Sequence, residues 1–91
     1  MSLERTETVD ASVIRDGWAI LTIHHFGEWD DLDGQIELLR RKIGHYLEFV
    51  ESPAFLERAH RVPVRIELVC ADPPPPPVEA VCLAYGVTVL D

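Results

Sequence analysis

A stripe of apolar side chains between residues 32 and 50 constrains the fold of this chain more than any other feature. The stripe consists of Leu32, Ile36, Leu39, Ile43, Tyr46 with Leu47, and Val50. Its spacing of three or four residues is that of one face of an amphipathic α-helix. A helix that begins near Asp30 and ends at Val50 is about 30 Å long, so the rest of the chain must cover a long apolar surface.

The ends of this helix and one position inside it carry further signals. Gly44 lies in the middle of the helix, where glycine costs up to about 1 kcal/mol relative to alanine, and we therefore expect a close backbone approach there. Pro53 ends the helix. Ser52 before it is suited to cap a second, short helix that reaches about Ala59.

Alternating apolar residues predict the strands of a sheet. The cleanest alternation runs from Val62 to Cys70 and indicates a strand with one buried face. Earlier in the chain, a first strand over 9–13 is followed by the turn signal Arg15-Asp16-Gly17 and a second strand from Trp18 to His24. Val87 to Leu90 is expected to form the last strand.

Five consecutive prolines, Pro73 to Pro77, precede the last apolar segment. We interpret them as a stiff spacer. A polyproline ligand is the other interpretation, but the nearest charges are Asp72 and Glu79, whereas many such ligands carry a flanking basic residue. The spacing from Val78 to Tyr85, with Gly86 as a terminator, favours a short helix. A strand at 78–85 stays open from the pattern alone.

The predicted order is β-β-α-(α)-β-α-β. It implies an α+β fold, a two-layer α/β sandwich in which a mixed four-stranded sheet carries its helices on one face, because crossover connections return right-handed to the same side. Residues 9–91 are expected to form a single domain, since a chain of this length rarely divides its core. Residues 1–8 are polar and aperiodic and are predicted to be a flexible N-terminus.

The charge and cysteine content exclude several classes of protein. A net charge of −8 argues against binding to nucleic acid. The basic run Arg40, Arg41 and Lys42 is predicted to be mainly solvated, because adjacent helix positions point in different directions. No apolar run reaches the roughly 20 residues of a membrane span. Cys70 and Cys82 are expected to be free, buried thiols in a cytoplasmic protein.

A tandem histidine is followed by several acids. His24 and His25, with Glu28, Asp30 and Asp31, are the residues that a metal ion would use. Successive strand residues point to opposite faces, so the two histidines can share one ion only if the chain already loops at His25. We favour the interpretation that the acids cap the N-terminus of the long helix. A small metalloprotein that uses these five residues is the alternative hypothesis.

No group of residues in the sequence points to catalysis. The serines lack a nucleophile motif, the glycines form no phosphate-binding loop, and both cysteines lie on predicted core faces. We therefore expect a protein that is not an enzyme and has no cofactor. The acidic surface suits a binding or regulatory module, for example an adaptor or toxin-neutralising protein, that attracts a basic protein partner.

The face of the sheet away from the helices is predicted to form a homodimer interface. Trp18, Ile20 and Val69 form its apolar centre, and Arg65 and Glu67 form a polar rim. Monomers seldom leave such a patch in water, two-fold dimers are the commonest closed assembly, and tryptophan is a frequent interface anchor. The apolar stripe of the long helix is the competing interface.

The stretch from Leu38 to Ser52, LLRRKIGHYLEFVES, has the pattern of a known family. Its pattern residues are Lys42-Ile43, Tyr46-Leu47, Phe49, Val50 and Glu51-Ser52, together with Val9-Asp10, Leu21-Thr22-Ile23 and Trp29-Asp30-Asp31. The chain resembles, over about Val9 to Ser52, a family of small bacterial proteins of unknown function. Gly44 departs from the family pattern, which prefers asparagine. The resemblance implies a bacterial, cytoplasmic, single-domain α+β protein and assigns no catalytic residue.

Overall fold

The computed structural model describes residues 9–59 and 62–90. Its elements are β1 (Ala11–Arg15), β2 (Trp18–His25), α1 (Leu32–Val50), α2 (Pro53–Arg58), β3 (Val64–Cys70), α3 (Pro76–Tyr85) and β4 (Thr88–Leu90). The sheet order is β1-β2-β3-β4, with β1 antiparallel to β2 and the other two pairs parallel. The predicted α+β class and the mixed four-stranded sheet are therefore confirmed. The predicted flexible N-terminus falls on residues 1–8, outside the described residues.

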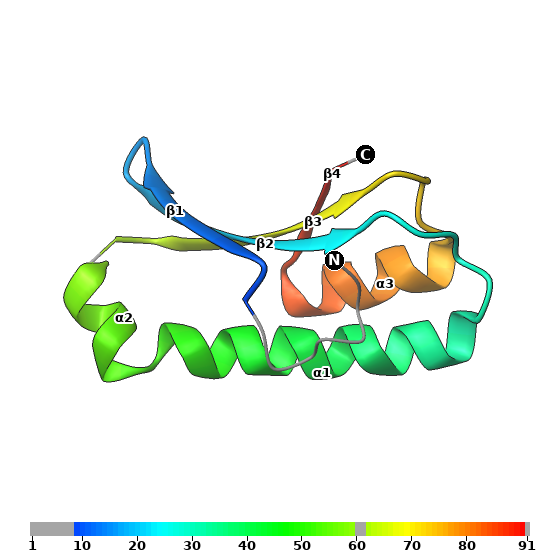
Figure 1. The fold of residues 1–91 in the computed structure, drawn as a ribbon, viewed down its shortest axis with the longest axis horizontal. Helices are drawn as coiled ribbons and strands as arrows, with labels where there is room; N and C mark the ends of the chain where they lie inside the picture. Colours follow the sequence, from blue (N-terminus) through cyan, green and yellow to red (C-terminus); the bar gives the residue numbers. More distant parts are fainter. Residues whose placement is uncertain (1–8, 60–61, 91) are drawn as a thin grey trace.

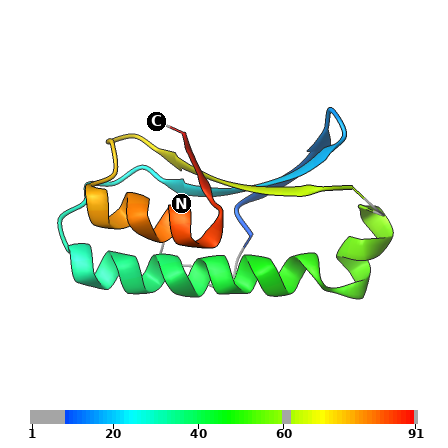
Figure 2. The same cartoon turned by 180° about the vertical axis from the view of Figure 1, so that it is seen from behind.

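The two longer helices lie on one side of the sheet. Figures 1 and 2 show α1 and α3 on the same side of the sheet, with α3 beside the N-terminal half of α1. The short helix α2 lies at the C-terminal end of α1, at the same end of the molecule as the hairpin that joins β1 to β2 (Figure 1). Within the described part of the chain, no helix is long and apolar enough to cross a membrane.

Local signals in the sequence place most of the element ends. The hairpin turns at Asp16 and Gly17, whose φ angles of 54° and 80° are both positive, as a two-residue turn of this kind requires. The Ser52 side chain caps α2 by accepting a hydrogen bond of 3.3 Å from the Phe55 amide. Gly86 ends α3 with a φ of 73°. These three predictions are confirmed.

The proline run is only in part the predicted spacer. Helix α3 begins at Pro76, so its first two residues are Pro76 and Pro77. Proline is tolerated there because the first helical residues have no intrahelical partner for their amide groups. Residues 78–85 are helical, which decides between the helix and the strand that the pattern left open.

The start of α1 differs from the prediction. Asp31 is the N-cap residue, but its side chain makes no capping hydrogen bond, so the predicted capping by this carboxylate is wrong. The Asp31 carboxylate instead lies where a Cβ atom on Gly34 would be. Asp33 does lie in the first turn, where its charge complements the helix dipole.

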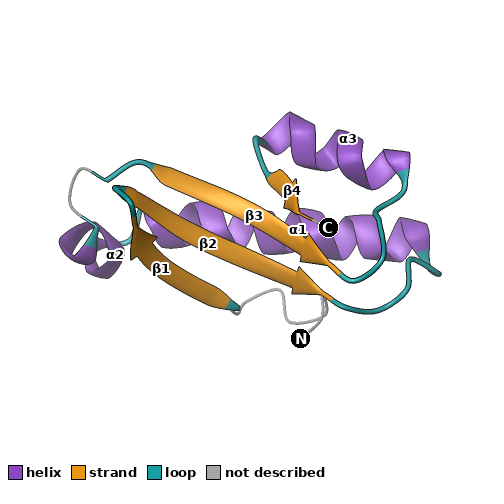
Figure 3. Ribbon diagram, turned by 90° about the horizontal axis from the view of Figure 1, so that it is seen from above, coloured by secondary structure: helices purple, strands orange, loops and turns teal. Residues whose placement is uncertain are grey.

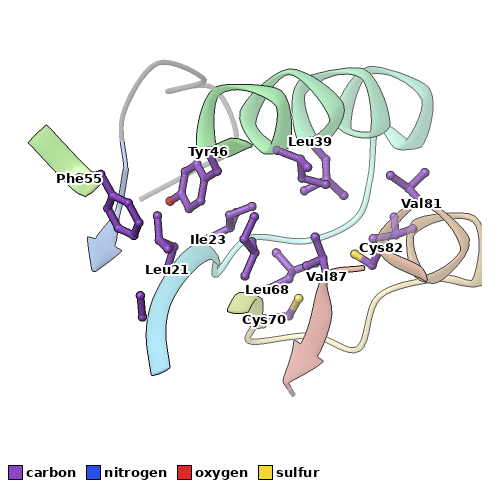
Figure 4. Close-up of a cluster of buried hydrophobic side chains, with 14 of the residues drawn as sticks. Leu21, Ile23, Leu39, Tyr46, Phe55, Leu68, Cys70, Val81, Cys82 and Val87 are labelled. Atoms are coloured by element: carbon purple, nitrogen blue, oxygen red, sulfur yellow. The ribbon is translucent and has the colours of Figure 1, made fainter. Parts of the chain in front are cut away.

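The core lies between the sheet and the two longer helices. Leu21, Ile23 and Leu68 point from the sheet toward the side of α1 that carries Leu39 and Tyr46, and all five are 0% exposed (Figure 4). Helix α3 contributes Val78, Val81 and Cys82 to the same cluster. Cys70 and Cys82 are both buried, as predicted. Burial raises the pKa of Cys82 from 9.0 to about 11, which makes this thiol a poor nucleophile at neutral pH.

Gly44 does not mark a close backbone approach, so that expectation is wrong. Apart from the backbone of its own helix, no heavy atom of residues 9–59 and 62–90 lies within 4 Å of a Cβ atom built on Gly44. The position therefore has the conformational cost of glycine in a helix without the packing reason for it. We expect Gly44→Ala to raise the free energy of unfolding by about 0.5–1 kcal/mol and the Tm by several degrees. Thermal denaturation followed by circular dichroism measures this, and a lower Tm than that of the wild type contradicts it.

Candidate interaction surface

The five predicted interface residues share one face of the sheet. Leu21 and Ile23 of β2 belong to the buried core, and successive strand residues alternate between faces. The intervening residues therefore point away from the helices. The register pairs them as Ile20 with Arg65, Thr22 with Glu67 and His24 with Val69. Figure 3 looks onto this face, and no described helix covers it.

Trp18 and Arg65 interact directly on this surface. The Arg65 guanidinium carbon lies 4.7 Å from the centroid of the Trp18 ring, a cation–π contact that contributes about 0.5–1 kcal/mol at an exposed site. Arg65 Nη1 is also 3.8 Å from Glu67 Oε2. Trp18 is still 37% exposed. The arrangement orders a large aromatic side chain and leaves much of its surface available to a partner.

Two apolar residues that the sequence did not identify extend the surface. Val13 pairs with Ile20 across the hairpin, and Leu90 of β4 pairs with Val69. They are 48% and 41% exposed, whereas Ile20 itself is only 7% exposed. The Asp-Gly turn signal fixes the register of Val13 and could have identified it. Leu90 could be found only once the strand order was known.

The charge of this surface differs from that of the whole protein. The register places Arg15 beside Trp18, so two arginines, Arg15 and Arg65, accompany one glutamate, Glu67, on this face. The chain as a whole has a net charge of −8. Two copies that meet through this face therefore avoid most of the repulsion that other contacts between two acidic molecules would meet.

The proposed metal ligands do not come together. His24 stacks on Phe26 with the ring centroids 5.3 Å apart. His25 is buried, with its ring 4.2 Å from that of Trp29 and its Nε2 3.3 Å from the Glu28 carbonyl oxygen. The carboxylates of Glu28, Asp30 and Asp31 belong to exposed residues. Among residues 9–59 and 62–90, no three histidine, cysteine, aspartate or glutamate side chains are grouped to hold a metal ion.

A buried polar network that the sequence did not reveal joins the N-terminal segment to α1. Lys42 Nζ lies 2.8 Å from Asp10 Oδ1, and both side chains are 0% exposed. The other oxygen of Asp10 accepts a hydrogen bond of 2.9 Å from the His24 amide. The prediction that Lys42 is solvated is therefore wrong. Lys42 lies three residues after Leu39 and four before Tyr46, so it falls on the buried side of the helix.

Tyr46 completes this network. Its hydroxyl donates a hydrogen bond of 2.6 Å to the Thr22 carbonyl oxygen and accepts one of 2.8 Å from the Asp10 amide. Burial raises the pKa of Tyr46 from 10.0 to about 12. The printed bonds of this network link Lys42 and Tyr46 of α1 to Asp10 and to the backbone of β2, so the network fixes the position of α1 against β2.

Comparison with known proteins adds one finding. The model of a family of unknown function (DUF6572) matches residues 1–75, a longer part of the chain than the pattern residues between Val9 and Ser52. No curated protein and no solved structure matches the chain.

Proposed function

We propose that this chain, which belongs to the family of unknown function DUF6572, is a non-enzymatic binding module that works as a homodimer. The interface is the uncovered sheet face around Trp18. The observation that carries this proposal is the contact of Arg65 with a tryptophan that remains 37% exposed. A large, ordered aromatic side chain is what the centre of a protein interface most often contains.

A second copy of the chain fits this face better than an unrelated partner does. In a two-fold interface every contact occurs twice, because if one residue meets a second residue of the partner, the second also meets the first. Arg65 of one copy can therefore pair with Glu67 of the other, and the reverse pair forms as well. Both residues lie on the same strand, two positions apart, with Trp18 beside Arg65. The exposed Val13 and Leu90 add apolar area on either side.

The rest of the dimer surface suits a basic protein. Glu28, Asp30, Asp31 and Asp33 are exposed where β2 leads into α1, and the net charge is −8. Such a surface accelerates association with a positively charged partner. Partners captured on the immobilised protein should be basic proteins that are released by salt. Captured partners that are not basic, or that salt does not release, contradict the proposed binding of a basic protein.

The dimer is tested by measuring the molar mass in solution. We expect the wild type to be a dimer at micromolar concentration in light scattering coupled to size exclusion. Trp18→Asp places a charge at the centre of the interface, and we expect it to weaken the dimer by at least about thirtyfold, as loss of an interface hot spot does.

Leu83→Asp is the matched control. Leu83 is 83% exposed on α3, so the same charge is introduced on the helical side and the dimer should persist. Circular dichroism establishes that each variant is folded. A monomeric wild type, or a folded Trp18→Asp that remains dimeric, contradicts the proposal.

A further inference from the structure

A groove on the helical side of the protein lies between α1 and α3. It has a volume of about 570 Å³, within the range of small-molecule sites. Ile36 of α1 and Val81 of α3 line it with apolar surface. Ala80 and Ala84, which also line it, have side chains too small to fill the space between the helices. Figure 2 shows α3 running beside the N-terminal half of α1, where the groove lies.

Arg40 gives this groove a positive charge. It is exposed on α1 and lines the groove with Tyr85 at the end of α3. Among the described residues, the Arg40 side chain makes no ion pair or hydrogen bond. The nearest acid along the same helix, Glu37, is instead bound to Arg41, with Arg41 Nε 3.2 Å from Glu37 Oε1. The groove therefore has an apolar wall and an unneutralised guanidinium on a protein whose net charge is −8.

We propose that the groove binds a small amphipathic carboxylate. The aliphatic part lies along Ile36, Val81 and the two alanines. The carboxylate pairs with the Arg40 guanidinium, whose planar set of N–H donors matches its two oxygens. The Tyr85 hydroxyl is the other side-chain hydrogen-bond donor of the lining. The charge of the site selects an anion, and its apolar wall selects an aliphatic chain.

Decanoate is the probe that tests this assignment. It is titrated below its micelle concentration into the ¹⁵N-labelled protein. We expect saturable binding with a Kd of about 1 mM or lower, the affinity available to a ligand of this size. The amide shifts should change around Ile36 and Arg40 on α1 and over 80–85 on α3, and not on β1 or β4. An absence of saturable binding, or shift changes confined to the sheet, overturns the proposal.

Two exposed arginines provide a matched pair of variants. Arg40→Gln removes the positive charge from the groove and should weaken decanoate binding about tenfold, the usual effect of losing a hydrogen-bonded charge pair. Arg58→Gln changes the net charge equally at an exposed site on α2 that does not line the groove, and it leaves Glu37 bound to Arg41, so the Kd should stay within about twofold. Equal weakening by both variants means that only the overall charge matters, and overturns the proposal.

The apolar part of the site is tested in the same way. Ala84→Phe fills the groove and should abolish decanoate binding. Leu83→Phe changes the neighbouring residue, which does not line the groove, and decanoate binding should remain. Decanol, which has the same chain without the charge, should bind at least about tenfold more weakly than decanoate. Decanol binding as tight as that of decanoate overturns the assignment of Arg40.

This proposal is independent of the sheet-face dimer, because the groove is formed by the two helices. Arg40→Gln should leave the dimer intact, and the monomeric Trp18→Asp should still bind decanoate. If Trp18→Asp abolishes decanoate binding as well as the dimer, the binding site is not formed by α1 and α3 of one copy alone, and the assignment is wrong.

Discussion

Lys42→Met is expected to lower the free energy of unfolding by about 3–5 kcal/mol, the usual effect of removing one member of a buried ion pair. The Asp10 carboxylate, which is 0% exposed, then has no cation beside it. A domain of this size has a total stability of roughly 5–10 kcal/mol, so the variant is expected to be partly unfolded near body temperature. Urea denaturation followed by tryptophan fluorescence measures the change.

A neighbouring variant and a double variant distinguish the ion pair from a general effect of losing a lysine. Arg41→Met removes an equal charge from the next residue, which is exposed, and should change the stability by less than about 1 kcal/mol. Adding Asp10→Asn to Lys42→Met should recover much of the loss. The amide oxygen of Asn can still accept the His24 hydrogen bond, and neither of the two positions then carries a buried charge. A double variant no more stable than Lys42→Met contradicts this account.

The protein should lose stability in alkaline solution through Tyr46. The tyrosine hydroxyl has a pKa of 10.0 in the unfolded chain and about 12 in the fold, so between these pH values only the unfolded chain releases its proton. The stabilisation is complete below pH 10. It is lost as the pH rises toward 12, by up to about 1.4 kcal/mol for each pH unit and about 2–3 kcal/mol in all. Denaturation curves at a series of pH values measure this fall.

Cys82 adds a similar loss at slightly lower pH, because its pKa rises from 9.0 to about 11 on folding. Tyr46→Phe separates the two contributions. The variant is less stable at neutral pH because the Asp10 amide loses its acceptor, but it should keep only the part of the alkaline loss that Cys82 causes. The Tyr46 assignment fails if the wild type and Tyr46→Phe lose stability equally between pH 10 and 12.

The secondary structure could be predicted because it is determined by local signals. The stripe from Leu32 to Val50 predicts α1, the alternation up to Cys70 predicts β3, and the Asp16-Gly17 turn predicts the hairpin. Each of these depends on residues close together in the chain. The resemblance to a family of unknown function is also confirmed, and the family model extends beyond the stretch that carries the resemblance.

The errors concern residues whose environment depends on distant parts of the chain. The sequence predicts that Lys42 is solvated, because lysine is seldom buried. Its counter-ion, Asp10, lies 32 positions away in the chain. A glycine inside a helix predicts a close neighbour at Gly44, but no other described element approaches it. Aspartate is a common helix-capping residue, yet the side chain of Asp31 makes no capping hydrogen bond. Spacing along one element cannot reveal these contacts.

The sheet face could be predicted in part from the sequence, whereas the groove could not. The alternation of β2 and β3 placed Trp18, Arg65 and Val69 on one face, and the register agrees. The cation–π contact and the contribution of Leu90 needed the relative positions of the strands. The groove beside Arg40 could not be predicted, because it forms between helices that are separated by β3 in the chain.

The order of the strands in the sheet is their order in the chain, β1-β2-β3-β4, and this bears on how the protein is made. As the chain leaves the ribosome, the hairpin of β1 and β2 can form first, because its strands are neighbours in sequence. Strand β3 then adds to the free edge of β2, and β4 adds to the free edge of β3. No strand has to enter between two that are already paired, so the sheet can grow from one edge in step with synthesis.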